Sequence, residues 1–275
     1  MLGVQWQAVQ REAQLAATQA AHGVTVLRRA NHAQPGLYTQ AFFGLSIGIE
    51  RMGKLIFLVD YAISNGGDFP SDKDLRKVGH NLVDLLIKCE DISQHLSQSI
   101  DWISRPKNEI HQGIEEVLSQ FAVKLRYYNL NYLAGSAQNQ QDPLALWWEK
   151  VAEPICNRHY SKKQRDQDQL ESILIQNLLG EHSFVIHSTE AGEPINSVQQ
   201  YLLKGRATHI VQKYSQLYTL QILRWLTSML WQLSSYGTYK KDIQAFLGLH
   251  EPFSFFLNED KYFRNRKTWS IYRYR

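Results

Sequence analysis

Residues 41–88, AFFGLSIGIERMGKLIFLVDYAISNGGDFPSDKDLRKVGHNLVDLLIK, decide the fold. The first half of this stretch is apolar, and its polar residues are not scattered, since Glu50 and Lys54 stand four positions apart and would pair on one helix face. Gly44 and Gly48 share the same spacing and would let a second helix approach closely. A helix covered by apolar side chains on nearly all sides is buried. We therefore expect a central core helix here.

The second half of the stretch predicts a turn and another helix. Residues 65–70, NGGDFP, are turn formers. Ser71, followed three positions later by Asp74, is typical of a helix start. The sequence GHNLVDLL at residues 79–86 then opens a further apolar helix. Two packed helices joined by a short turn are the expected result.

Three features together resemble the HEPN family of small helical-bundle domains: the Glu-x-x-x-Lys helix at residues 49–54, the Gly-Gly turn, and the His-Asn-Leu-x-x-Leu-Leu sequence that begins at His80. The resemblance covers roughly residues 5–134, about half the chain, if four helices are counted. It implies an up-and-down helical bundle that binds RNA. It also implies a homodimer in which the last helices of two bundles pair across a two-fold axis.

Composition limits the class of protein. The chain has 275 residues, 44% of them hydrophobic, and a net charge of +4, which permits contact with nucleic acid without requiring it. Cys89 and Cys156 lack the spacing of a zinc site and indicate a reducing compartment. Residues 217–233 are apolar but contain Arg224, which favours a buried helix over a membrane span. We expect a soluble, cytoplasmic protein without a membrane partner.

The rest of the chain also predicts mainly α structure. Pro106 stands where the first residue of a helix would be, with Ser104 as its cap, and that helix is expected to continue to Leu133. The polar loop at residues 134–143 is the clearest linker. We therefore divide the chain into a HEPN-like helical bundle, residues 1–137, and a mainly helical extension with a basic, aromatic tail, residues 138–275.

Within the extension, residues 170–179 have the pattern of an amphipathic helix. Residues 183–187 form a short β-like run that precedes a turn. A long helix is expected over residues 197–234, with a break at Gly205 left open.

Arg105 and His111 are the first candidates for chemistry. HEPN-like nucleases pair an Arg with a His four to six residues later, because a His can move a proton and an Arg can stabilise the charge of the phosphorane. Five residues separate Arg105 from His111, at a helix start that favours phosphate. The alternative is a capping Arg and a surface His without a catalytic role.

Arg126 begins a second candidate site. Its place in the helix order suits the HEPN resemblance, but Asn131 stands where the His would fall, and Asn cannot shuttle protons near neutral pH. Tyr127, Tyr128 and Tyr132 would stack on bases or pack between helices. This departure from the family pattern argues against cleavage at this place.

The most basic stretch is the C-terminal tail, residues 261–275, in which aromatic side chains alternate with cations. Such a segment suits phosphate contact combined with base stacking. The alternative is an arm that packs on the bundle with its charges in solvent. The charged residues 158–168 are expected to be only a solvated face. The candidate contacts to nucleic acid in the tail are Lys261, Arg264, Arg266, Lys267 and Arg273.

Glu50, Lys54 and His80 are expected to form a structural polar seam in which His80 binds Glu50. A functional alternative places Glu50 and His80 beside Arg126 in a shared cleft. The sequence predicts no cofactor and no metal site, because no set of ligands with suitable spacing is present.

Two functions follow from these patterns. The leading hypothesis is an HEPN-like RNA-binding protein, with metal-independent RNA cleavage in prokaryotic defence or a toxin–antitoxin system left open. The alternative is a non-catalytic helical interaction module that binds a protein or a nucleotide ligand. The expected partners are RNA, a second copy of the chain, or another protein.

Overall fold

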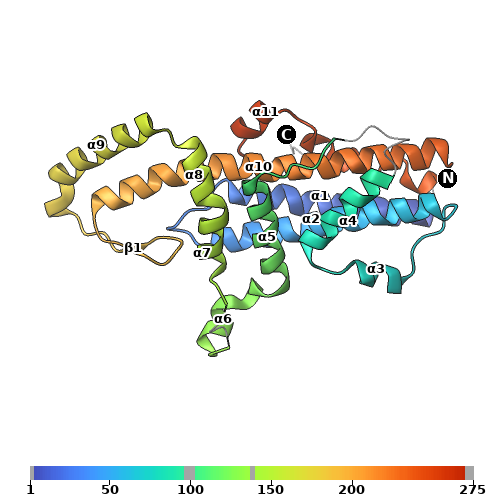
Figure 1. Cartoon of the computed structure of the whole chain (residues 1–275), viewed down its shortest axis with the longest axis horizontal. Coiled ribbons are helices and arrows are strands. Elements are labelled where there is room, and N and C mark those ends of the chain that lie inside the picture. The colour runs from blue at the N-terminus through green and yellow to red at the C-terminus, as the bar shows by residue number, and fades with distance from the viewer. Residues whose placement is uncertain (1–2, 96–102, 137–139, 270–275) are drawn as a thin grey trace.

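The computed structural model describes residues 3–95, 103–136 and 140–269. Over these ranges the chain forms eleven α-helices, with short 3₁₀ and π turns between them and one small two-stranded hairpin. Figure 1 shows the long helices running side by side, with shorter helices across one face and an arm at one end. The mainly α fold class is therefore confirmed.

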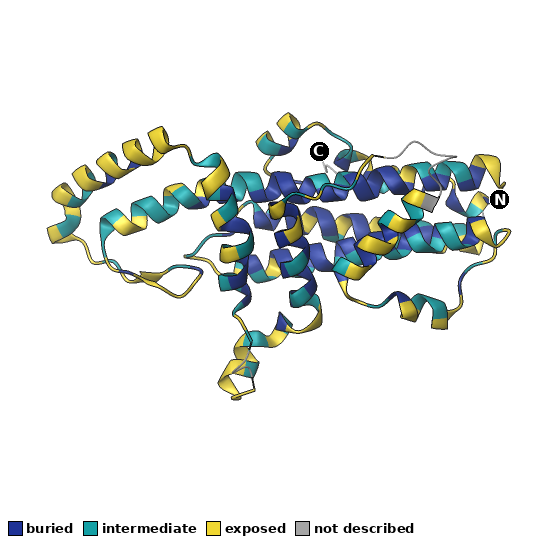
Figure 2. Ribbon diagram, in the orientation of Figure 1, coloured by how far each residue is buried: buried dark blue, intermediate teal, exposed yellow. Residues whose placement is uncertain are grey.

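Helix α2 (Gly36–Ser64) lies at the centre, as its apolar sequence predicts. It packs along α1 (Val4–Leu27) and along the middle of α10 (Val198–Lys240). Figure 2 shows the buried residues concentrated along these three helices. The fully buried side chains of α2 include Phe42, Leu45, Ile49, Met52 and Ile56.

The expected close approach of a second helix to α2 is confirmed, and that helix is α1. A Cβ atom built on Gly48 would lie 2.7 Å from the backbone nitrogen of Ala20, and one on Gly44 would lie 2.9 Å from the carbonyl oxygen of Gln19. From the other side, a Cβ on Gly23 would lie 2.6 Å from the nitrogen of Leu45. The two backbones are therefore in direct contact, with no room for a side chain between them.

The turn after α2 follows the prediction. Ser71 caps α3 (Asp72–Val78) by accepting a hydrogen bond from the backbone N–H of Asp74. Helix α4 (Leu82–His95) then crosses α2, and α5 (Glu109–Val123) packs on both.

The predicted start of α5 is wrong by three residues. Asn108 is the cap, because its Oδ1 accepts hydrogen bonds from the backbone N–H groups of Ile110 and His111. Pro106 lies in the extended segment before the helix. The helix also ends at Val123, and a 3₁₀ turn (Leu125–Tyr127) and the short α6 (Tyr128–Leu133) follow.

The second half of the chain begins with α7 (Pro143–Trp147), a π-helical turn (Trp148–Ala152) and α8 (Glu153–His159). Helix α9 (Lys162–Leu179) starts within the segment expected to be a solvated face. The strands β1 (His187–Ser188) and β2 (Pro194–Ile195) pair antiparallel. Helix α10 passes Gly205 without a break, and α11 (Asp260–Asn265) packs back onto it.

One hydrophobic core runs through both halves of the described chain. Trp225 and Leu226 of α10, together with Phe246, Phe253 and Phe263 of the segment after α10, join the core residues of α1 and α2. The boundary between two domains at residue 137 stays a prediction. The hydrophobic core contains residues from both sides of this boundary. In the described ranges, no helix is both long and apolar enough to span a lipid bilayer.

The helix contact gives a first prediction. We expect Gly48→Ala to lower the free energy of unfolding by about 1–3 kcal/mol, because the added methyl group has backbone atoms of α1 in its place. Gly205→Ala is the matched control. No atom lies within 4 Å of a Cβ at Gly205, so we expect this change to stabilise the protein by about 0.5–1 kcal/mol. Urea unfolding of both variants checks the pair, and equal effects would contradict it.

Candidate nucleic-acid interface

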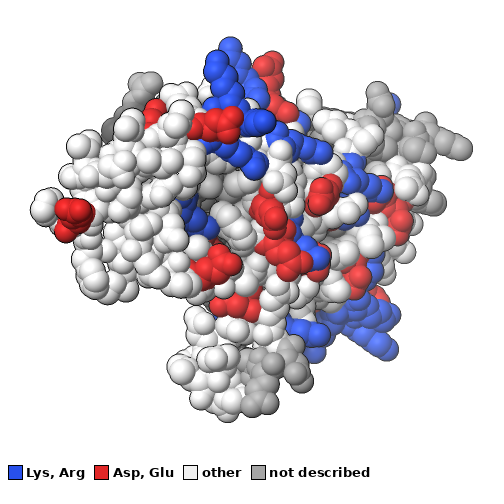
Figure 3. All heavy atoms as spheres, turned by 60° about the vertical axis from the view of Figure 1, so that its left-hand side comes forward, with Lys and Arg blue, Asp and Glu red and all other residues white. Residues whose placement is uncertain are grey.

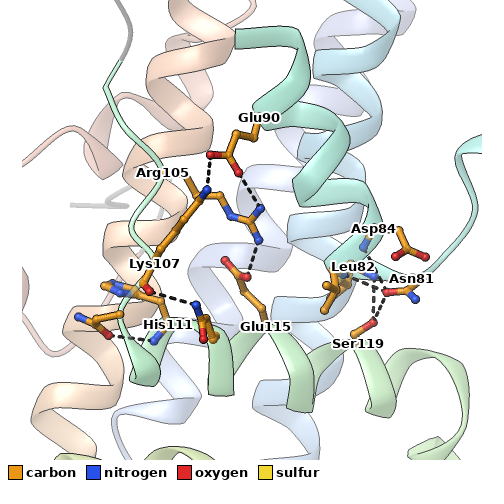
Figure 4. A network of polar contacts seen from close by, with 12 residues as sticks. Asn81, Leu82, Asp84, Glu90, Arg105, Lys107, His111, Glu115 and Ser119 are labelled. Carbon is orange, nitrogen blue, oxygen red and sulfur yellow. Dashed lines mark hydrogen bonds and ion pairs between the residues drawn. The ribbon is translucent and has the colours of Figure 1, made fainter. Parts of the chain in front are cut away.

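Arg105 lies in a buried ion cluster. Its guanidinium donates to Glu115 at 2.6 Å and to Glu90 at 3.2 Å, and only 7% of its side chain is exposed. Lys107 also pairs with Glu90, at 2.5 Å. Burial raises the pKa of Glu115, although Arg105 opposes this shift. Figure 4 shows that these side chains link α4 and α5 to the segment between them. Arg105 therefore holds the bundle together and is not free to bind phosphate.

His111 is buried in a different set of contacts. Its Nε2 lies 2.8 Å from Oε1 of Gln221 on α10, and the amide nitrogen of Gln221 donates to Asp260 at 2.8 Å. An amide oxygen only accepts, so Nε2 carries the proton. Burial lowers the pKa of His111 to about 4, with the bond to Gln221 partly opposing the shift. Arg105 and His111 thus bind separate partners inside the protein, and a catalytic role for them stays a prediction.

Asn81, in the middle of the His-Asn-Leu sequence, has a structural role at the start of α4. Its Oδ1 accepts hydrogen bonds from the N–H of Val83 at the start of α4 and from Oγ of Ser119 on α5. Ser119 in turn accepts from the N–H of Leu82. The sequence pattern therefore caps α4 and ties it to α5 (Figure 4).

Glu50, Lys54 and His80 meet in one place. Oε1 of Glu50 accepts from Nζ of Lys54 at 2.6 Å and lies 2.9 Å from Nδ1 of His80. Lys54 and His80 line a hollow of about 540 Å³ between α1, α2 and α3. Arg126 lines a different hollow, so the structure does not form the shared cleft that we considered as an alternative.

Arg126 lies in a hollow of about 480 Å³ where the starts of α2 and α7, the turn before α6 and the hairpin meet. Its guanidinium stands 5.3 Å from the ring centre of Phe43 and makes a 3.4 Å contact with the carbonyl oxygen of Ala122. Within the described residues, no carboxylate pairs with it. Tyr127 and Tyr128 also line this hollow, whereas Asn131 does not.

The described part of the tail packs against the body of the protein. Nε of Arg266 donates to the carbonyl oxygen of Thr268, and its guanidinium stacks on Tyr262 and Trp269. Trp269 is buried, and its backbone N–H donates to Oγ1 of Thr25. Trp269 therefore fastens the tail to α1, with Arg266 stacked on its ring, while Lys261 and Lys267 are exposed. Arg273 lies outside the described residues.

Arg264 lies near enough to His159 for its charge to lower the pKa of that ring. We define the His159 surface as Arg158 and His159 at the end of α8, Lys213, Tyr214 and Tyr218 on α10, and Arg264 on α11. The rings of His159 and Tyr214 are stacked, with centroids 3.6 Å apart and planes 6° from parallel. Nε2 of His159 lies 2.8 Å from the hydroxyl of Tyr218, which also accepts a 3.4 Å hydrogen bond from Arg158.

Three positive charges surround this stack. Burial lowers the pKa of His159, and the charges of Arg158, Arg264 and Lys213 lower it further. In the described part of the chain, none of the three cations forms an ion pair with a carboxylate; the charge of Glu109 reaches Arg158 only at longer range. When Tyr218 donates its hydroxyl hydrogen to Nε2, the proton of the neutral ring is on Nδ1. Such a group of donors suits a phosphate.

The His159 surface is bordered by acidic residues, because Glu109, Glu149 and Glu153 line a hollow together with Arg158. Figure 3 shows acidic side chains interleaved with basic ones over the face that it draws, so that face carries no broad patch of one sign. The surface was missed in sequence because its residues come from three segments that meet only in the fold. The one available signal was the Arg-His pair at the end of the charged run.

Comparison with protein families, with curated proteins and with solved structures finds no match to this chain.

The burial of His111 predicts a dependence of stability on pH. Between pH 6.5 and about 4 the unfolded chain binds a proton that the folded chain refuses, so stability falls as the pH is lowered through this window, by about 3 kcal/mol in total. His111→Gln should reduce this slope, whereas His22→Gln, at an exposed position of α1, should not. Denaturant unfolding at several pH values measures both, and equal slopes in the two variants would contradict the assignment.

Proposed function

We propose that the protein binds single-stranded RNA on the His159 surface. The observation that carries the proposal is a set of three cations without carboxylate partners in the described chain, placed around a stacked His–Tyr pair. Cations contact the phosphates of a nucleic acid, and exposed aromatic rings stack on its bases. The HEPN resemblance of residues 5–134 supports RNA as the nucleic acid.

Each part of the surface has a defined task in this proposal. Arg158, Lys213 and Arg264 pair with successive phosphates, and Nδ1–H of His159 donates to one of them. The half-buried Tyr214 stacks on His159 and holds its ring in place, and the exposed part of this pair contacts a base. The exposed Lys261 on α11 and Lys267 just beyond it extend the path of the strand.

Binding without cleavage agrees best with these contacts. Arg105 and His111 are buried among their own partners. Arg126 has an Asn in place of the family's His, and Asn131 does not line the same hollow. His159 uses Nε2 for Tyr218 and is surrounded by cations, which do not favour its acting as a base. Metal-independent cleavage of RNA stays a hypothesis that rests on the sequence pattern alone.

The test measures binding of a labelled single-stranded RNA by fluorescence anisotropy over a range of salt concentrations. We expect the combined variant Arg158→Gln, Lys213→Gln, Arg264→Gln to bind at least about 10-fold more weakly, and the slope of log K against log salt to decrease by about 2, since three phosphate contacts are lost. Lys73→Gln, on the exposed side of α3, is the control for removing one positive charge away from the His159 surface and should retain both values.

The same samples decide between binding and cleavage. Intact RNA after incubation with the wild-type protein in EDTA agrees with the proposal, and cleavage that persists in the combined variant would place the activity elsewhere. Equal loss of affinity in the combined variant and in Lys73→Gln would overturn the proposed surface.

A second candidate function is the binding of a small nucleotide in the Arg126 hollow. The observation that favours it is a cation without a carboxylate partner among the described residues, in a concave site of about 480 Å³ that the start of α2 and Tyr128 line. Helix starts and an Arg favour phosphate, and a Tyr favours an aromatic ring. Asp142 and Glu190 also line the hollow, but the first caps α7 and the second pairs with Lys204.

Calorimetry with nucleoside monophosphates and diphosphates checks this second candidate. We expect Arg126→Gln to weaken nucleotide binding by about 10-fold or more, because a charge-assisted contact is removed. Arg76→Gln, in the exposed part of α3, is the matched control. Heat of binding that is unchanged in Arg126→Gln would exclude this site.

A further inference from the structure

Helix α9 is attached to the protein by its polar face. Asp168 and Ser172 are its buried residues. Arg206 of α10 lies 3.6 Å from Asp168 and 3.1 Å from Glu171. The side chain of Gln176 accepts a hydrogen bond from the backbone N–H of Gln199. Ion pairs and a hydrogen bond therefore hold this helix against α10.

The opposite face of α9 is apolar and exposed. Leu170, Leu174 and Leu178 follow one another at intervals of four residues and are exposed by 65%, 63% and 75%, and Ile173 lies beside them. Figure 2 shows this outer face on an arm that projects from the body of the protein. An amphipathic helix normally turns its apolar face inward. The reversed orientation indicates that another surface covers α9.

We propose that α9 pairs with α9 of a second copy of the chain, antiparallel about a two-fold axis at Leu174. In this register Leu170 of one copy lies opposite Leu178 of the other, and Leu174 lies opposite itself. A two-fold interface must be complementary to itself, and the Leu170–Leu174–Leu178 stripe has this property.

The charges at the ends of α9 support the antiparallel direction. The helix begins with Lys162 and Lys163, and Glu181 and His182 follow its end. Antiparallel pairing about Leu174 places Asp166 opposite His182, and Lys163 lies four residues from Gln167, the residue that faces Glu181. A parallel pair would place the lysines of both copies together, which is unfavourable.

A competing dimer follows from the HEPN resemblance, which pairs the last helices of two bundles. In this chain α6 holds that position and exposes Leu130 and Leu133. However, α6 has only six residues and α9 has eighteen, with a regular apolar stripe. The longer, regular face agrees better with a stable helix pair, and the two dimers are distinguished by separate substitutions.

The first experiment measures the mass of the RNA-free protein by sedimentation equilibrium over a range of concentrations. We expect a dimer, and we expect Leu174→Glu to raise its dissociation constant at least about 100-fold, because two unpaired carboxylates meet at the axis. Leu133→Glu is the control and should remain dimeric. Circular dichroism checks that both exposed substitutions leave the fold intact.

A second experiment tests the register. Leu174→Cys should form a covalent dimer with a short bismaleimide, because residue 174 faces its own copy. Leu170→Cys and Leu178→Cys should give little product alone and a cross-linked dimer when mixed, and the unsubstituted chain controls for Cys89 and Cys156. A monomer at all concentrations, a dimer that survives Leu174→Glu, or a dimer that is lost in Leu133→Glu alone would each overturn the proposal.

Discussion

The contact between the backbones of α1 and α2 is the constraint on which the rest of the fold depends. Gly23, Gly44 and Gly48 bring the two helices so close that atoms of one backbone occupy the space where a side chain of the other would be. Dispersion energy depends steeply on distance, so this contact is dense and leaves little freedom in the crossing of the helices. The two helices then present one continuous apolar surface, on which α10, α4 and α5 pack from different sides.

Buried polar groups fix how the outer helices lie on this surface. Arg105 joins α4 and α5 through Glu90 and Glu115, Ser119 joins α5 to the cap of α4, and His111 joins α5 to α10 through Gln221. A buried charge or hydrogen-bonding group without its partner is costly, so these links specify one arrangement among several that hydrophobic packing alone would permit. The residues that resemble a nuclease motif, Arg105 and His111, thus have a structural explanation in this chain.

The sequence predicted the elements whose signals are local. The apolar run of α2, the Ser71 cap and the small residues of the helix contact need only their neighbours in sequence to be recognised. The cap at Asn108 was missed because Pro106 and Ser104 offered a competing local pattern. The His159 surface could not be predicted, since Arg158, Lys213 and Arg264 are more than fifty residues apart between successive members and meet only when α8, α10 and α11 pack together. Periodicity identified α9 as amphipathic but could not tell which face would turn outward.

The two proposed surfaces have a geometric relation, because α9 begins three residues after His159. In an antiparallel pair about Leu174 the starts of the two α9 helices lie at opposite ends, about 36 Å apart, because Lys162 is twelve residues from the axis in each copy. The two His159 surfaces of a dimer are then separated by at least the length of that helix pair. A short strand reaches one surface, whereas a strand long enough to reach both gains the effective concentration of a second, intramolecular contact. Pairing through α9 would in this way make the affinity for RNA depend on the length of the strand. This dependence requires no contact with the bases beyond stacking.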